Sequence, residues 1–315
     1  MQRYIVRRLL LIIPTVVGVS ILVFLLVRML PGDILTEIAA EFGLTPEEET
    51  RLRAEYGLDR PIYTQYFAWM GEVVRGDLGE SLLTRRPVLH DLGRRLVPTV
   101  ELGAIALVVS LAVAIPIGVL AALKQDTIAD YAARGGAILF LSIPSFWLAV
   151  LILVVGAIWF GWAPPARYVP LWEDPASNLK LMVIPALVLG TYGTGGVMRL
   201  MRGQMLEVMR QDYIRTARAK GLRERLVVLR HAVKNAFIPV ITYIGFMIPM
   251  YLSATVVVEW VFAVPGVGRF LIESVQNRDY TVIQGVNLII ALVVAFSNLA
   301  VDISYSYLDP RVRYQ

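Results

Sequence analysis

Six long apolar stretches limit what this sequence can fold into more than any other feature does. A helix rises about 1.5 Å per residue, so about 20 apolar residues are needed to cross the hydrocarbon core of a membrane. We predict such spans near residues 9–29, 99–123, 136–160, 181–199, 237–258 and 282–304. The chain is 57% apolar and 17% charged, whereas soluble domains are about 45–50% apolar and about 25% charged. The sequence therefore predicts an all-α polytopic membrane protein with six transmembrane helices.

Five prolines lie inside these spans or near their ends. In a membrane, neighbouring groups can satisfy the carbonyls that a proline leaves unpaired, so we expect each proline to be a kink that serves packing. They are Pro14, Pro116, Pro144, Pro185 and Pro249. The first span follows a basic start, MQRYIVRR, but no small-residue cleavage site follows the span, so we predict an uncleaved anchor.

The distribution of basic residues predicts the orientation of the spans. Arg3, Arg7 and Arg8 place the N-terminus in the cytoplasm by the positive-inside rule, and six crossings return the C-terminus to the same side. The segment 30–98 then lies outside, and it carries twelve acidic residues against eight arginines. The segment 200–235 lies inside, with nine basic residues against three acidic ones.

The external segment 30–98 is too long for a structureless connection, so we predict a small helical extracytoplasmic cap. The sequence TPEEE predicts a helix that is capped by Thr45 and ends at the helix-stopping Gly57. A second helix is expected over 61–74, and 76–88 is typical of a turn with a short extended stretch. The cap either braces the membrane helices or docks an external partner, and the sequence leaves both open.

The central parts of the predicted spans contain no charged residue or histidine, which argues against an ion-coupled secondary transporter. Uncharged polar residues within the spans are usually packing contacts, but together they could line a path for a polar solute. The candidate path residues are Ser142, Ser145, Thr191, Tyr192, Thr242 and Asn287. The glycines at 193, 195 and 196 are expected to allow close helix packing, with a hinge as the alternative.

Nothing in the sequence predicts catalysis. The chain has no cysteine, and its two histidines, His90 and His231, are far apart, so we expect no metal site. No GxxxxGK[ST] phosphate loop is present, so ATP hydrolysis by that chemistry is excluded. We find no Ser/His/Asp set and no paired carboxylates, and we predict neither catalytic residues nor a cofactor bound by this chain.

The basic insert after the fourth span is predicted to be a helix, a turn and a second helix. Residues 203–220 have helix-forming composition, Gly221 interrupts it, and the run 222–236 leads into the fifth span. The small residues Ala217 and Gly221 lie four apart, which would let a partner approach closely. A simple positive-inside anchor is the alternative, but a helix presented to a groove of another protein explains more of the pattern.

The stretch TARAKGL…RHAVKNAFIPV (216–240) resembles the cytoplasmic coupling loop, or EAA loop, of binding-protein-dependent ABC permeases. Arg215, Thr216 and Ala217 occupy the Glu-Ala-Ala places, and Gly221 is the motif glycine. His231 stands at the isoleucine place and the motif proline is replaced by lysine. These departures are usual in the first-permease (B-type) subunit of the dipeptide/oligopeptide/nickel group, which other segments also resemble. Those segments are RMLPGD, YGLDRPIYTQY, GDLGESLLTRRPV, LSIPSFWLA, VEWVFAVPGVGRFLIESVQNRDYTVIQG and YLDPRVRY.

The resemblance implies one transmembrane permease domain over residues 1–315, with the cap at 30–98 and the coupling loop at 200–236. A second homologous permease subunit would complete the channel, two ATP-binding subunits would hold ATP and Mg, and an extracytoplasmic binding protein would deliver the solute. No nucleic acid is expected, and the location would be a bacterial or archaeal cytoplasmic membrane. The residues expected to couple to the ATPase are Tyr213, Arg215, Thr216, Ala217, Arg218, Lys220, Gly221, His231 and Asn235.

The resemblance leaves the cargo open among dipeptides, oligopeptides, nickel chelates and oligosaccharides. Two other functions also stay open at this point. One is a self-contained channel or secondary transporter for a small polar solute, and the other is a membrane-embedded enzyme. The lack of charged groups within the spans disfavours both of them.

Overall fold

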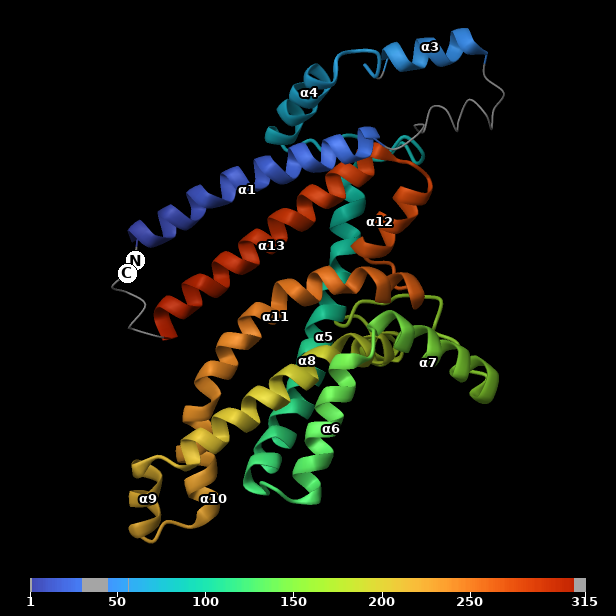
Figure 1. Ribbon diagram of the computed structural model, residues 1–315. Coiled ribbons are helices and arrows are strands. Elements are labelled where there is room, and N and C mark those ends of the chain that lie inside the picture. The colour runs from blue at the N-terminus through green and yellow to red at the C-terminus, as the bar shows by residue number, and fades with distance from the viewer. Residues whose placement is uncertain (1, 30–44, 56, 309–315) are drawn as a thin grey trace. The chain divides into compact units, whose positions relative to one another are not determined.

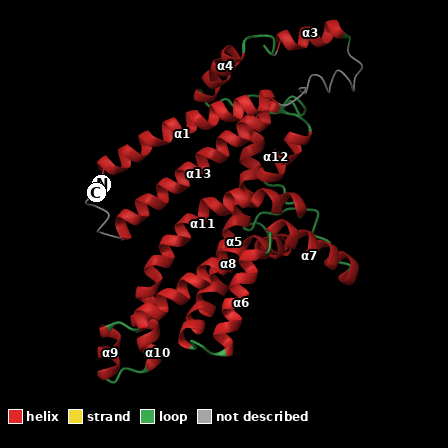
Figure 2. Ribbon diagram, viewed as in Figure 1, coloured by secondary structure: helices red, strands yellow, loops and turns green. Residues whose placement is uncertain are grey.

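The computed structural model describes residues 2–29, 45–55 and 57–308, and its regular elements are helices (Figure 1). Figure 2 shows no strand among these residues. Their only pairing between extended segments is an isolated bridge that joins Glu80 to Pro87. Residues 30–44 of the predicted cap and most of the segment YLDPRVRY lie outside the described residues. The predicted all-α class is confirmed. The elements are α1 (Gln2–Met29), α3 (Pro46–Glu55), α4 (Ile62–Val74), α5 (Val88–Leu123), α6 (Ile128–Ser142), α7 (Ser145–Phe160), α8 (Pro175–Met209), α9 (Asp212–Ala219), α10 (Glu224–Leu226), the π-helix η1 (Val227–Ala232), α11 (Val233–Val261), α12 (Val267–Gln276) and α13 (Tyr280–Leu308).

Five helical segments of the described chain are long and apolar enough to cross a membrane, and a bent pair of helices brings the number to as many as six. The five are Leu10–Met29, Val88–Leu123, Pro175–Met209, Glu224–Val261 and Tyr280–Val301. The second of them begins eleven residues before the predicted 99–123, because the helix continues past the end of its apolar run. The predicted prolines at 14, 116, 185 and 249 lie inside helices α1, α5, α8 and α11.

The predicted span over 136–160 is not one continuous helix, although the bent pair that replaces it passes the same test of length and hydropathy. The helices α6 and α7 meet there at an angle of 96°. Ile143 adopts an extended conformation with φ −83° and ψ 119°, and Pro144 is the N-cap residue of α7. A proline disfavours the helical conformation of the residue before it and cannot donate a backbone hydrogen bond, so this proline ends one helix and starts the next.

The chain divides into two compact units, which are described separately. The first consists of Met1–Val97 and Pro265–Gln315. In it α1 lies side by side with α13, and α12 also packs on α13 (Figure 1). One apolar cluster joins the membrane helices to the cap helix α4. Its buried members are Phe24, Trp69, Leu78, Val88, Leu92, Val267, Phe270, Val282, Val286 and Leu288.

The described part of the cap follows the sequence prediction closely. Thr45 and Glu48 form a capping box, in which the Thr45 N–H donates to the Glu48 carboxylate over 2.8 Å and the Glu48 N–H donates to Thr45 Oγ1 over 3.3 Å. Gly57 and Gly76 follow α3 and α4 with φ values of +64° and +86°. These left-handed conformations favour glycine, which explains why both helices stop there.

The second unit, Pro98–Val264, is built around α8, which packs against α6, α7 and α11. Its glycines allow this close approach, as predicted. A Cβ atom on Gly193 would collide with Tyr251 Oη, and one on Gly195 would lie 2.6 Å from the Ala137 carbonyl oxygen. Because a larger residue would meet backbone or buried side chains, the interpretation of this glycine run as a packing surface is confirmed.

Candidate coupling site

A short helix, α9, lies at the end of α8 and close to the start of α11 (Figure 1). The prediction of one continuous helix over 203–220 is wrong, because α8 stops at Met209 and α9 starts at Asp212. Gln211 is extended, with φ −73° and ψ 149°, and serves as the N-cap residue of α9. The new helix then begins with an acidic residue, which suits the positive end of a helix dipole.

Helix α9 has one buried face and one exposed face. Ile214 is 0% exposed and Ala217 is 7% exposed, and both belong to the main apolar cluster of the second unit. The helix packs against η1, whose Val227 and Ala232 are buried in the same cluster. The expectation that Ala217 offers a partner room to approach is therefore wrong, since its side chain already packs inside the chain. Ala219 is on the exposed face instead.

The glycine after α9 is required by its backbone conformation. Gly221 has φ +78°, and a Cβ atom there would meet nothing within 4 Å. Its N–H donates to the Arg218 carbonyl over 2.9 Å, and the Leu222 N–H donates to the Ala217 carbonyl over 3.4 Å. This pair of bonds is a Schellman motif, which ends a helix with a left-handed residue. Glycine therefore sets the direction of the turn, and it also leaves open space beside it.

Two side-chain interactions hold α9 in place. The Arg218 guanidinium donates to both carboxylate oxygens of Glu224, over 2.7 and 3.1 Å, and so closes the turn. The hydrogen bonds between the two side chains raise the pKa of Arg218 and lower the pKa of Glu224. Asn235 Nδ2 donates to Tyr213 Oη over 3.0 Å and to the His231 carbonyl over 2.8 Å. Sequence reasoning missed Glu224, although a carboxylate six residues after Arg218 across a glycine turn was an available signal.

The structure thus brings most of the predicted coupling residues together on α9 and the elements that hold it. His231 lies in the π-helix η1, so the predicted helical run 222–236 contains a widened turn of a kind that is frequent at functional sites. Arg215 pairs weakly with Asp212 over 3.4 Å, with exposed fractions of 75% and 93%. Thr216 and Lys220 are exposed, and Lys220 forms no ion pair within the described part of the chain. The outer face is therefore mostly basic and open.

The predicted path residues are not singled out by their geometry. Four of them donate hydrogen bonds to carbonyls of their own helices, namely Ser142 to Ile138, Thr191 to Val188, Thr242 to Ile238 and Asn287 to Ile283. Ser145 starts α7, and Tyr192 is 49% exposed on α8. Asn287 belongs to the first unit and the other five to the second. Their role in a solute path stays a prediction.

Charged residues near the ends of the membrane helices fasten neighbouring segments, and the sequence analysis missed this role. Glu101 accepts hydrogen bonds from Tyr168 Oη over 2.9 Å, from the Leu171 N–H over 3.0 Å and from Asn178 Nδ2 over 2.8 Å. This network ties the loop between α7 and α8 to α5. Burial, together with the neighbouring carboxylate, raises the pKa of the Tyr168 hydroxyl. Among the described residues, no group of acidic or histidine side chains could hold a metal ion.

Comparison with known proteins places this architecture in a family. The model of the binding-protein-dependent transport system inner membrane component matches residues 114–314, and the model of its N-terminal part matches residues 1–103. The chain belongs to this family. It is therefore the permease subunit of a binding-protein-dependent importer and a multi-pass protein of the inner membrane, with a role in transport and not in catalysis. The interpretation as a self-contained channel or a membrane enzyme is thereby disfavoured.

Relatives of this permease match over its whole length. It is 38% identical to the dipeptide transport system permease protein DppB of Escherichia coli strain K12, with 100% of both chains covered. It is 40% identical to a putative peptide transport system permease protein of Brucella abortus strain 2308 and 37% identical to the oligopeptide transport system permease protein AppB of Bacillus subtilis strain 168, again with 100% of each chain covered.

Solved structures agree with the fold. The inward-facing MetNI methionine ABC transporter matches with a TM-score of 0.56 at 16% identity, over 70% of this permease and 97% of that chain. An amino acid ABC transporter matches with a TM-score of 0.50 at 17% identity, over 71% and 94% of the two chains. At this level of identity the likeness shows a shared fold alone.

Proposed function

We propose that this permease forms half of the channel through which a peptide-like solute enters the cell. A second homologous permease would form the other half, two ATP-binding subunits would hold ATP and Mg, and an extracytoplasmic protein would deliver the solute. Both termini would lie in the cytoplasm, together with α9. The peptide cargo is supported by the full-length relatives named as dipeptide and oligopeptide permeases.

We further propose that α9 is the part of this permease that docks in a groove of one ATP-binding subunit. The observation that carries the proposal is its packing. Its inner face is buried on η1, while Arg218–Glu224 closes its exit turn and Asn235 fastens it near the start of α11. A helix held in this way moves with α11 as one body, so that a displacement of the ATP-binding subunits would reach the membrane helices. ATP must bind the two resulting states with different affinity for the switch to work.

The docking is tested by Ala219→Trp, which adds bulk to the exposed face of α9 without disturbing its buried face. The matched control is Ala176→Trp, at an exposed alanine near the start of α8, the end of that helix far from α9. We expect the Ala219 variant to reach the membrane in normal amount but to lose co-purification of the ATP-binding subunit and uptake. The control should keep both. Normal co-purification and uptake in the Ala219 variant would exclude docking at this face.

The cargo is tested by uptake of labelled solutes into cells that carry the complete system or lack this permease. The solutes are alanyl-alanine, an oligopeptide of five residues, a nickel chelate and an oligosaccharide. We expect uptake of at least one peptide to depend on this chain. Dependence for the chelate or the oligosaccharide alone would overturn the proposed peptide cargo.

A further inference from the structure

A groove of about 250 Å³ lies in the second unit, between α6 and α8. Its wall combines three arginines with small and apolar side chains, which are Ala121, Ala133, Ala137, Ile138, Leu141 and Met198. Sites for small molecules commonly measure about 300–1,000 Å³, so this smaller groove suits one segment of a chain better than a whole solute.

The groove lies where the apolar stretches of sequence end. Arg199 is the last residue of the predicted span 181–199, and Arg134 lies two residues before the predicted start of a span at residue 136. Ile138 and Leu141 lie on the apolar side of this boundary, and Ile138 is 63% exposed. The groove is therefore at the level where lipid headgroups meet hydrocarbon, and it has a charged end and an apolar end.

The arginines give the groove an excess of positive charge. Arg202 is paired with Asp130, whose carboxylate accepts hydrogen bonds from its Nε over 2.6 Å and its Nη2 over 2.7 Å. Arg134 and Arg199 are exposed, and neither forms an ion pair within the described part of the chain. The Arg134 guanidinium lies 5.5 Å from the centre of the Tyr131 ring, one turn earlier on α6. Since no acidic residue lines the groove, a carboxylate neutralises only one of its three guanidinium groups.

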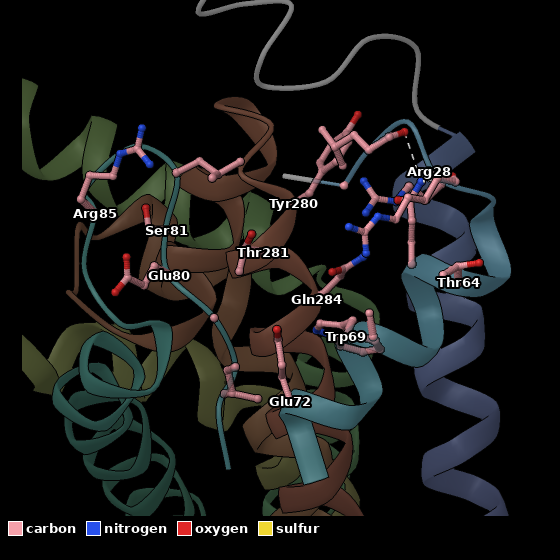
Figure 3. Close-up of a pocket in the computed structure, with 18 residues that line it drawn as sticks. Arg28, Thr64, Trp69, Glu72, Glu80, Ser81, Arg85, Tyr280, Thr281 and Gln284 are labelled. Atoms are coloured by element: carbon pink, nitrogen blue, oxygen red, sulfur yellow. Dashed lines mark hydrogen bonds between the residues drawn. The ribbon is translucent and has the colours of Figure 1, made fainter. Parts of the chain in front are cut away.

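This charge distribution differs from that of a larger cavity beside the cap helix α4 in the first unit. The larger cavity measures about 410 Å³, and arginines and glutamates line it together, among them Arg85, Glu72 and Glu80 (Figure 3). A wall with charges of both signs does not favour one class of ligand. A wall with uncompensated positive charge beside apolar surface favours an anionic group that is joined to a hydrocarbon chain.

We propose that the groove between α6 and α8 binds an anionic phospholipid. Its phosphate lies against Arg134 and Arg199, and part of one acyl chain lies along Ile138 and Leu141. Guanidinium groups form charge-assisted and often bidentate hydrogen bonds with phosphate, and basic pockets between membrane helices are sites for anionic headgroups. Figure 1 shows the loop between α5 and α6 at the same end of the second unit as α9, so the orientation proposed for α9 puts this lipid in the cytoplasmic leaflet.

The test is native mass spectrometry of the purified transporter with all its subunits. The transporter is titrated with phosphatidylglycerol and with phosphatidylcholine of the same acyl chains. Arg134→Gln and Arg199→Gln each remove one charge, and the double variant removes both. The matched control is Arg210→Gln, which removes an exposed charge at the end of α8 and outside the groove.

We expect the unaltered transporter to retain one phosphatidylglycerol per copy of this permease, at concentrations where phosphatidylcholine is not retained. The double variant should bind phosphatidylglycerol about tenfold more weakly or worse, because its charge-assisted contacts with the phosphate are lost, and each single variant should lie between. The Arg210 variant should bind normally. Glycerol 3-phosphate at millimolar concentration should not displace the lipid, because it has no acyl chain for the apolar end of the groove.

Unchanged affinity in the double variant, or equal retention of the two lipids, would overturn the proposal. Displacement by glycerol 3-phosphate would assign the arginines to a free phosphate compound and would also overturn it. A complete transporter that retains no phosphatidylglycerol would show that another part of the protein covers the groove, with the same consequence. The proposed docking of α9 and the proposed peptide cargo do not depend on any of these results, since neither proposal uses the groove.

Discussion

The ion pair between Asp130 and Arg202 gives the sharpest prediction about stability. Asp130 of α6 is 0% exposed, and its carboxylate accepts hydrogen bonds from Arg202 Nε over 2.6 Å and Nη2 over 2.7 Å. It also accepts one from the Asp126 backbone N–H over 3.1 Å. The Arg202 side chain on α8 keeps 19% of its surface exposed. Removal of Arg202 leaves a buried carboxylate without its partner, whereas removal of Asp130 leaves a partly exposed guanidinium. The two substitutions should therefore lower the free energy of unfolding by different amounts.

Arg202→Met should be the more damaging change. It leaves a carboxylate with no exposed surface and a single donor, and removing one partner of a buried ion pair costs about 3–5 kcal/mol. Asp130→Asn leaves a guanidinium that can turn toward solvent, so we expect about 1–3 kcal/mol, the cost of losing hydrogen bonds to a charged group. The double variant should recover part of the loss, because no charge is then left buried without its partner.

The measurement is a double-mutant cycle on the free energy of unfolding of the purified protein in detergent, followed by tryptophan fluorescence. Arg199→Met is the matched control, since Arg199 is exposed one turn earlier on α8, and it should change stability by less than about 0.5 kcal/mol. Equal costs for the two single variants, or a double variant whose cost is the sum of theirs, would refute the reasoning.

Two further predictions follow from the packing and capping of α8. Gly193→Ala should destabilise the protein by about 1–3 kcal/mol, because its new Cβ atom would collide with Tyr251 Oη. Gly18→Ala is the control and should leave stability unchanged, because a Cβ atom at Gly18 would meet nothing within 4 Å. Thermal unfolding of the two variants measures the difference. Asp174 caps α8, and the Ser177 hydroxyl and backbone N–H hold the pKa of its carboxyl below the ordinary value of 3.8. The pKa of Asp174 is lower in the folded protein than in the unfolded chain. The cap therefore stabilises the helix fully at pH values above the unfolded pKa, and its effect is lost as the pH falls through the lower, folded pKa. At acid pH, amide hydrogen exchange at the start of α8 should therefore be faster than the pH dependence of exchange in an unfolded peptide predicts. In Asp174→Asn this additional acceleration should be absent.

In the cap, short stretches of sequence were enough to predict where the helices begin and end. Its helix start at Thr45 and its stops at Gly57 and Gly76 were predicted, because capping side chains and left-handed glycines act within a few residues of the chain. The apolar run 136–160 shows where such reasoning fails. Both halves of it are apolar, so hydropathy predicts a single span. Pro144 breaks the helix locally, but the size of the angle, 96°, depends on what α6 and α7 pack against.

The candidate coupling site divides in the same way. The motif residues and the turn at Gly221 were evident in the sequence, since a glycine inside a basic helical pattern is a local signal. The burial of Ala217 was not, because a helix as short as α9 can turn either face inward, and the surface of η1 decides which.

The sequence by itself determined the membrane class, the family, the cap helices and the position of the coupling turn, because apolar length, capping and glycine conformation are properties of short stretches of chain. The tertiary structure alone decided the angle between α6 and α7, the inward face of α9 and the pairing of Asp130 with Arg202. Each of these depends on which surfaces meet across long separations in the chain, and a periodic pattern of side chains does not specify that.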